Sequence, residues 1–278
     1  MRRRRMVPYI FLLPYALLFI LFMICPIAYS VYLSLFTSKA GINKYVGTRN
    51  YEKAFKDTAF WSGFGNVALY GVIVIVVMIS LSLVLALILD SNKIKGKGLF
   101  RLLFFLPYAV PGIIAAIMWG FLYSPDFNVI WKWLSVTPYN ALMFCLVNIT
   151  VWLWTGYNMT IIYANLTTIS LDIYEAAKLD GCNEFQTAIY MKIPLIKSTI
   201  FMTIALTIIG ALQLFNEPYM LTDLTAISST YTPNMYIYNM AFSYGNFPYS
   251  ATLSIILAVI TILISSIFKF VTRERKLR

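Results

Sequence analysis

The side chains that could do chemistry in this 278-residue chain are few, and they suit binding better than catalysis. The sequence has no histidine, the commonest general base and metal ligand. Its three cysteines, Cys25, Cys145 and Cys182, lie far apart, a spacing that gives no disulfide framework, zinc site or redox pair. No phosphate-binding G-x-x-x-x-G-K-S/T loop occurs, so the chain has no recognisable means of using ATP. We therefore expect no catalytic residue, no metal and no cofactor, and a protein that is not an enzyme.

The most distinctive polar stretch reads E-A-A-K-L-D-G and lies between two long apolar runs. It mixes small and charged side chains: Glu175, Ala176, Ala177, Lys178, Asp180 and Gly181. Small residues let a partner approach closely, and charged residues fix the orientation of that partner. The stretch therefore suits docking to another protein, although its spacing alone fits an ordinary solvated loop equally well.

The local sequence predicts a helix in this stretch. Asp172 is a good N-cap, and Glu175 three residues later completes a capping-box pattern. The helix should cover residues 173–180 and end at Gly181, because glycine adopts the left-handed conformation that often follows a helix.

A second helix should follow directly. Asn183 and Gln186 repeat the capping pattern and predict a helix to about residue 191. Pro194 then falls near the start of the next apolar run, where its missing N–H is harmless. We expect residues 172–192 to form a compact helix–turn–helix.

The rest of the chain is too apolar for a soluble domain. Hydrophobic residues make up 60% of it and charged residues 12%, with a mean hydropathy of +0.75, whereas soluble domains carry about a quarter charged residues. Six apolar runs are each near or above the roughly 20 residues that a membrane-crossing helix needs. They are residues 7–36, 65–89, 100–123, 141–169, 196–215 and 251–271. The sequence predicts an all-α integral membrane protein with six transmembrane helices in one domain, residues 1–278.

The first apolar run follows four arginines, as a secretory signal peptide would. It is long and lacks a clear small-x-small cleavage site, so we interpret it as a retained span. The formal net charge of +11 does not indicate nucleic-acid binding, because the basic residues flank the apolar runs.

The basic residues also predict the orientation. One side of the membrane would hold sixteen of them: four at residues 2–5, four between 93 and 101, three between 178 and 197 and five between 269 and 278. The connections on the other side would hold the remaining six. The positive-inside rule then places both termini and the Glu175–Gly181 stretch in the cytoplasm. The connections at residues 37–64, 124–140 and 216–250 face outward. Two tryptophans within residues 126–133 suit a membrane interface.

The polar stretch resembles a known family. The string from Glu175 to Gly181, then Gln186, then a proline 13 positions after the glycine, with Leu195 behind it, is similar to the signature of bacterial ABC-transporter permeases served by a binding protein. Cys182 stands where alanine is usual in that family, which is a mild departure.

The resemblance extends over most of the chain. Residues 45–51 with Phe60 and Trp61 resemble the first outer loop of maltose-type carbohydrate permeases, and residues 98–111 resemble their third span. The pattern favours the first of the two permease subunit types. Residues 221–226 depart from the glycine-rich T-x-G-G-P segment that relatives often carry after the fifth span.

The resemblance implies a function and partners. The chain would be one permease of a heterodimer in the bacterial cytoplasmic (inner) membrane, working with a second permease, an ATPase dimer and an extracytoplasmic solute-binding protein that delivers sugar. The signature segment would be a cytoplasmic coupling helix between spans four and five that docks on the ATPase. The resemblance assigns this coupling role to the matching positions: Glu175, Ala176, Ala177, Asp180, Gly181, Gln186 and Pro194.

Polar and aromatic side chains inside the predicted spans are candidates for binding sugar. Unpaired polar groups are costly in a membrane and tend to be functional there. Amides can both donate to and accept from hydroxyls. The candidates are Asn148, Trp152, Trp154, Tyr157, Asn158, Gln213, Asn216 and Glu217. Any one of them could instead serve helix packing. Gln213 and Asn216, near Glu217 at the end of the fifth run, are the favoured pair.

Two alternatives remain open. An ion-coupled secondary transporter would need ionisable residues near the membrane midplane, and Glu217 and Asp223 are expected nearer its outer side. An ABC permease for a non-sugar solute would share the coupling segment and differ in its cargo.

Overall fold

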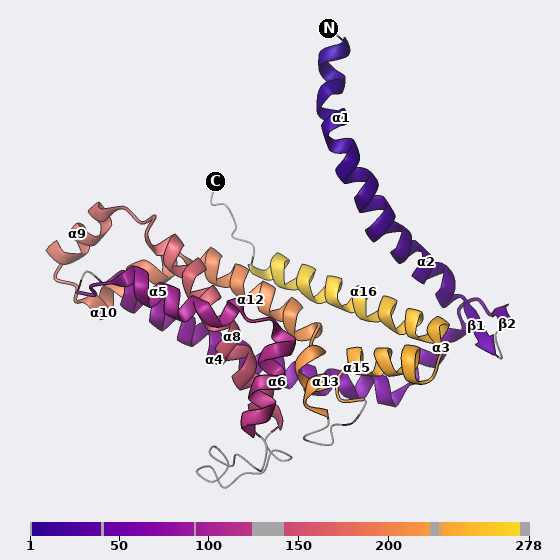
Figure 1. Cartoon of the computed structure of the whole chain (residues 1–278). Helices are drawn as coiled ribbons and strands as arrows, with labels where there is room; N and C mark the ends of the chain where they lie inside the picture. Colours follow the sequence, from indigo (N-terminus) through magenta and orange to yellow (C-terminus); the bar gives the residue numbers. More distant parts are fainter. Residues whose placement is uncertain are drawn as a thin grey trace.

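The computed structural model describes residues 2–39, 42–91, 93–123, 142–222, 228 and 230–272. Most of this part of the chain is helical (Figure 1). The first half contains α1 (Arg2–Phe19), η1 (Ile20–Ile24), α2 (Cys25–Ser34), α3 (Arg49–Phe55), α4 (Thr58–Asp90), α5 (Lys97–Phe105), η2 (Leu106–Ala109) and α6 (Gly112–Tyr123). The second half contains α8 (Leu142–Leu166), α9 (Leu171–Leu179), α10 (Glu184–Thr187), η3 (Ala188–Lys192), α11 (Ile193–Leu195), α12 (Lys197–Leu212), α13 (Asn216–Met220), α15 (Pro233–Tyr238), η4 (Asn239–Ser243) and α16 (Phe247–Thr272).

Helix α4 is the central element of the fold. It has 33 residues, which at 1.5 Å per residue gives a length of about 50 Å. Hydrogen bonds join α4 to α8. The Tyr70 and Thr150 hydroxyls lie 2.6 Å apart, and Ser82 Oγ donates to the Thr155 carbonyl at 3.0 Å. Buried side chains of α4 and α8 share one core that also includes residues from α6, α12 and α15.

Three of the described helices are long and apolar enough to cross a membrane, namely Phe11–Ser34, Thr58–Asp90 and Phe247–Thr272. The number rises to five if each of two bent helix pairs counts as one span. Helix α8 has 25 residues, long enough to cross, but it is interrupted by polar side chains. Predicted runs 65–89 and 251–271 lie inside α4 and α16, and run 141–169 corresponds to α8, which ends at Leu166.

The prediction of one continuous helix over residues 100–123 is wrong. Helices α5 and η2 are followed by α6 at an angle of 92°. Val110 is extended, as a residue before proline tends to be, and Pro111 lacks the N–H that would continue the hydrogen-bonding pattern. The bend turns η2 towards α8.

The fifth predicted run, residues 196–215, also differs. Helix α12 ends at Leu212, and the preceding segment Glu184–Leu195 meets it at 68° around Ile196, which is not helical. Residues 213–215 are outside the helix, so the Gln213 side chain lies at a helix end rather than along it.

The all-α prediction is corrected at the end of the first run. The helix stops at Ser34, and strands β1 (Phe36–Lys39) and β2 (Ile42–Tyr45) pair antiparallel, with Phe36 opposite Tyr45. Asn50 Nδ2 donates to the Ser34 and Phe36 carbonyls at 2.8 and 2.6 Å, which satisfies backbone groups freed where the helix ends.

Two groups of connecting elements lie at opposite ends of the molecule. The hairpin and α3 lie at one end, and α9 and α10 lie at the other (Figure 1). The α1–η1–α2 helix extends away from the body, and its apolar window has no buried residue. An apolar helix with this exposure needs lipid or another chain to cover it. The predicted outer connection at 124–140, with its tryptophans, and Asp223 lie outside the described residues.

A close backbone approach at Gly156 makes this packing testable. A Cβ added at Gly156 of α8 would overlap the Phe104 carbonyl and come within 2.9 Å of Phe105 N, whereas nothing lies within 4 Å of a Cβ at Gly65. We expect Gly156→Ala to destabilise the protein by about 1–3 kcal/mol, because the backbone must shift. Gly65→Ala should leave stability equal or slightly higher, since alanine favours the helix. Thermal unfolding of the two purified variants checks this, and equal melting temperatures would contradict the close approach.

Candidate functional site

Residues 172–192, which we call the docking segment, fold as two short helices around a tight turn. Helix α9 begins after Ser170, whose Oγ accepts from Asp172 N at 3.3 Å, so the prediction of Asp172 as the N-cap is wrong. Gly181 has a φ of +79°, the left-handed conformation expected of it. Asn183 and Gln186 form a reciprocal capping box, with bonds of 2.8 and 2.9 Å, that starts α10. The turn is thus held by backbone geometry and a double cap.

Most of the signature residues are at the surface. Ala177 is the exception and is fully buried, while the other predicted coupling positions are exposed: Glu175, Ala176, Asp180, Gly181, Gln186 and Pro194. The carbonyl of Ala177 accepts from Cys182 N at 2.9 Å, a bond that closes the turn.

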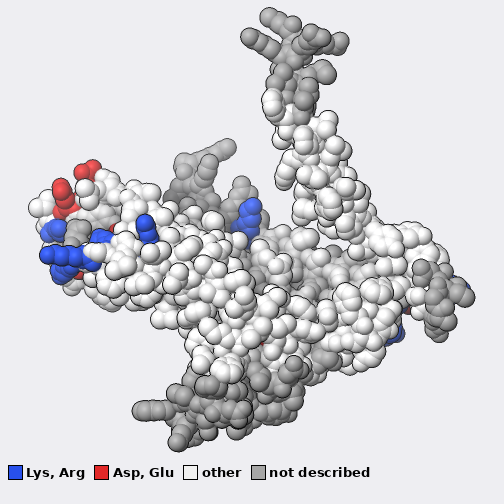
Figure 2. Space-filling model, viewed as in Figure 1, with Lys and Arg blue, Asp and Glu red and all other residues white. Residues whose placement is uncertain are grey.

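Large apolar side chains also project from the same segment. Leu179, Phe185 and Tyr190 are 89%, 73% and 72% exposed. Charged residues of both signs gather at this end of the molecule, while the rest of the visible face is almost free of charge (Figure 2). Apolar side chains surrounded by charges are typical of protein docking surfaces. Sequence reasoning missed these three residues because an apolar run follows them and their exposure cannot be read from hydropathy.

One carboxylate joins this segment to the body of the protein. Asp90 is the last residue of α4, and its Oδ2 atom accepts two hydrogen bonds. The donors are the Lys192 ammonium at 2.6 Å and the Tyr174 hydroxyl at 3.3 Å. Burial and the Asp90 charge raise the pKa of Tyr174 to about 12, so its hydroxyl stays protonated and donates. We refer to Asp90, Lys192 and Tyr174 as the inner triad. A second, fully exposed pair joins Lys93 and Glu184 at 2.9 Å, and this contact lowers the pKa of Glu184.

A cavity of about 500 Å³ lies between α4, α8, η2 and the end of α12, within the range of small-molecule sites. Its lining includes six of the eight predicted binding residues: Trp154, Tyr157, Asn158, Gln213, Asn216 and Glu217. The first three come from predicted run 141–169, and the last three lie at or just after the end of predicted run 196–215. Glu217 is the single acidic residue of the described lining, which contains no lysine or arginine.

Aromatic rings form one side of this cavity. Tyr108 of η2 stacks on Tyr157 at 4.6 Å between ring centroids, and Trp154 meets both rings edge-on at 5.1 and 5.7 Å. The bend at residues 110–111 gives Tyr108 this position. Sequence reasoning did not assign Tyr108, since a continuous third helix gives no reason to single it out.

Two predicted binding residues do not line the cavity. Asn148 Nδ2 donates to the Tyr123 hydroxyl at 2.7 Å, and Trp152 packs edge-on against Trp119 at 5.8 Å. Asn158 is almost fully buried and donates to the Trp154 carbonyl at 2.9 Å, so its amide is already partly occupied. Tyr70 and Thr150 line the cavity without having been predicted.

A second carboxylate anchors the opposite end of α4. Asp57 caps the helix and accepts from the Tyr236 and Tyr249 hydroxyls at 2.8 and 2.6 Å. Burial acts to raise its pKa, but these hydrogen bonds hold the pKa of Asp57 below its usual value. Lys53 Nζ lies 4.2 Å from the centre of the Tyr249 ring. The cluster ties α3 and α4 to α15 and α16.

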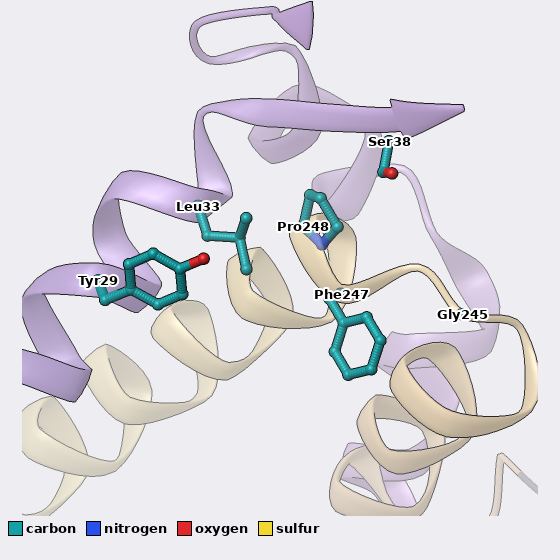
Figure 3. Close-up of a pocket in the computed structure, with 6 residues that line it drawn as sticks. All are labelled: Tyr29, Leu33, Ser38, Gly245, Phe247 and Pro248. Carbon is teal, nitrogen blue, oxygen red and sulfur yellow. The ribbon is translucent and has the colours of Figure 1, made fainter. Parts of the chain in front are cut away.

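A smaller cavity, about 360 Å³, lies where α2 and β1 meet the start of α16. It is lined by Tyr29, Leu33, Ser38, Gly245, Phe247 and Pro248 (Figure 3). It has two hydroxyls and no amide or charged side chain in its lining, so it lacks the converging polar groups of the cavity beside α8. Among the described residues, no group of three or more His, Cys, Asp or Glu could hold a metal ion.

Comparisons with known proteins identify a family. The family described as "Binding-protein-dependent transport system inner membrane component" matches residues 82–276. The chain is 34% identical over 283 residues to the lactose transport system permease protein of Rhizobium radiobacter, covering 96% of this chain and 94% of that protein. It is 28% identical over 279 residues to the trehalose/maltose transport system permease protein of Thermococcus litoralis, covering 96% and 94%.

The fold is also found among solved structures. A bacterial ABC transporter involved in the import of the acidic polysaccharide alginate contains a chain that matches with a TM-score of 0.81 at 19% identity, covering 99% of this chain and 98% of that one. A chain in the same kind of transporter, in complex with an alginate pentasaccharide-bound periplasmic protein, matches with a TM-score of 0.79 at 19% identity, covering 98% and 95%. At this identity the likeness concerns the fold.

The turn at Gly181 makes the geometry of the docking segment testable. A β-branched residue is strained at a positive φ, whereas asparagine tolerates it. We expect Gly181→Val to loosen residues 172–192 and to increase their cleavage by an added protease several-fold, and Gly181→Asn to leave cleavage close to wild type. Limited proteolysis of the purified protein measures this. Wild-type cleavage of Gly181→Val would contradict the turn.

Proposed function

The chain belongs to the binding-protein-dependent transport system inner membrane component family. From its similarity to the lactose and trehalose/maltose permeases, we propose that it is a permease subunit of an ATP-driven sugar importer. The observation that carries this proposal is the cavity beside α8, which brings aromatic rings, amides and one carboxylate together inside an otherwise apolar helical protein. Aromatic faces suit the apolar faces of sugar rings, and amides and carboxylates suit their hydroxyls.

In this proposal the chain crosses the membrane six times. The three long apolar helices, the two bent pairs and α8 supply the spans. The lower hydropathy of α8 is a consequence of its role, because Thr150, Trp154 and Tyr157 line the cavity rather than face lipid. Both termini and α9–α10 face the cytoplasm of a bacterium, where the positive-inside rule places sixteen of the 22 basic residues.

The docking segment of α9 and α10 is the contact with the ATPase. The chain shows no phosphate loop, so ATP would be used by a separate subunit. Support comes from the exposure of Glu175, Asp180 and Gln186 beside Leu179 and Phe185, on a segment that a capping box and Gly181 make rigid. ATPase closure would push on this segment and rock the helices around the cavity.

The remaining partners follow from the same assembly. A second permease and lipid would cover the exposed α1–η1–α2 helix, and together the two permeases would enclose the translocation path. A solute-binding protein outside the membrane would deliver sugar at the end that carries the hairpin and α3. No nucleic acid has a place in this arrangement.

An ion-coupled carrier is the second candidate. Glu217 lines the cavity, and a carboxylate there is what such a carrier would use to bind a cation. An ABC importer of a non-sugar solute would share ATP dependence but not the cargo. Uptake of a panel of labelled solutes into vesicles, with ATP or with an ion gradient as the energy source, separates the three. Uptake driven by an ion gradient without ATP would contradict the proposed function.

The coupling role predicts a specific effect at Glu175. Glu175→Ala removes an exposed charge from the docking segment, and we expect ATP-driven uptake to fall about tenfold or more, as for a central interface residue. Asp172→Ala, which removes the same charge one turn earlier on α9, is the matched control and should retain most of its uptake. Both variants should insert normally, as measured by their amount in the membrane. Wild-type uptake in a well-expressed Glu175→Ala variant would contradict the coupling role.

The cavity makes a separate prediction about two amides. Gln213 lines the cavity, whereas Asn148 is bonded to Tyr123 away from it. We expect Gln213→Ala to raise the sugar concentration for half-maximal uptake about tenfold, the effect of losing one or two hydrogen bonds. Asn148→Ala should leave that concentration unchanged, even where the amount of protein falls. The reverse pattern would place the sugar elsewhere.

A further inference from the structure

We propose that Asp90 is the positioning residue through which the docking segment moves helix α4, with Lys192 and Tyr174 as its partners. This inference rests on the proposed function and adds to it the contact that carries motion from the ATPase side to the cavity. Neither Asp90 nor Lys192 is among the positions that match the signature.

The inner triad attaches the docking segment to the body and is partly buried. The side chains of Asp90 and Lys192 are 12% and 13% exposed, against 71–78% for the nearby Glu184 and Lys93. Tyr174 reaches Asp90 from α9 and Lys192 reaches it from η3, on either side of α10. The two helical parts of the docking segment are therefore fastened to the same carboxylate oxygen. In Figure 1, α9 otherwise stands away from the helices of the body.

The charge on Asp90 explains why its partners are required. Asp90 is the last residue of α4, so its carboxylate adds negative charge to the end of the helix that is already negative. The Lys192 ammonium offsets both charges, and it also lies 4.9 Å from the centre of the Tyr174 ring. Lys97 Nζ donates to the Asp90 carbonyl at 3.4 Å from the other side. Pulling Lys192 away would leave a largely shielded carboxylate at a helix C-terminus with only a phenol as donor to its side chain, which is costly.

Movement of the docking segment should therefore carry the end of α4 with it rather than break the triad. Helix α4 then reaches the cavity, where Tyr70, Val74 and Met78 form part of the lining. Asn158 Nδ2 lies 3.7 Å from Met78 Sδ, and the Tyr70 hydroxyl is hydrogen-bonded to the Thr150 hydroxyl. A shift of α4 would therefore displace its contacts with α8 beside the cavity. A rigid element that contacts both sites is the physical requirement for coupling between them.

The test uses the assembled transporter, with both permeases and the ATPase, reconstituted into vesicles with the binding protein and sugar. One variant replaces both charges by apolar residues of similar size, Asp90→Leu with Lys192→Met. Replacing a whole buried ion pair in this way often leaves stability unchanged. The matched control, Lys93→Met, removes the exposed pair with Glu184 by a change outside the docking segment. A third variant, Asp90→Lys with Lys192→Asp, reverses the buried pair.

The readout is sugar transported per ATP hydrolysed, with the amount of assembled complex measured alongside. We expect the Asp90/Lys192 double variant to lose about tenfold in this ratio, a coupling effect of the usual size. The exposed-pair control should keep the wild-type ratio, and the reversed pair should recover part of the loss. An unchanged ratio in the assembled double variant, with only the amount of complex reduced, would overturn the proposal, since it would show a purely structural role.

A second measurement does not depend on any variant of the triad. Spin labels at the exposed positions Lys95 and Asp172 report the distance between the end of α4 and the docking segment. We expect the same distance in the nucleotide-free and the ATP-bound transporter, and a change of several ångströms would overturn the proposal. Absence of ATP-dependent uptake in the wild-type transporter would instead contradict the proposed function itself, which distinguishes the two failures.

Discussion

The two partly buried carboxylates at the ends of helix α4 are the constraint on which the arrangement of this protein depends. Asp57 binds two tyrosine hydroxyls from α15 and α16, and Asp90 binds Lys192 and Tyr174 from the segment that precedes α12. The two ends are physically different. Asp57 lies at the N-terminus, where the helix dipole favours an anion, whereas Asp90 lies at the C-terminus and needs a cation beside it. One helix of about 50 Å thereby connects α15 and α16 at one end to the docking segment at the other.

The bend between η2 and α6 and the end of α12 shape the cavity beside α8. A straight third helix would run past α8 and leave no space beside it. The 92° bend at Pro111 instead brings η2 against α8, where Gly156 admits the backbone at Phe104 and Tyr108 stacks on Tyr157. At the other side of the cavity, the end of α12 at Leu212 frees Gln213 and Asn216 to line it. Polar groups at a helix end are tolerated inside a helical bundle when they line a cavity, because they are not buried unpaired there.

The sequence predicted the parts of the structure that depend on local chemistry. Gly181 and the Asn183–Gln186 capping box lie where their spacing required, and the predicted runs each contain a helix. It did not predict features that depend on contacts between distant residues. Ser170 rather than Asp172 caps α9. Asn50 binds the end of α2 beside the hairpin, and Asp90 binds Lys192, which lies 102 residues away in sequence. The same limit explains why Gln213 and Asn148, both amides in or beside apolar runs, have different surroundings.

If this chain works as one half of a permease pair driven by a separate ATPase, its partners should purify with it. The decisive experiment is affinity co-purification of the chain from detergent-solubilised native membrane, with identification of every bound protein. We expect a second permease and a nucleotide-binding ATPase to be recovered with the chain. Recovery of the chain alone, from a preparation that remains folded and stable, would rule out this assembly and favour a carrier that works without ATP.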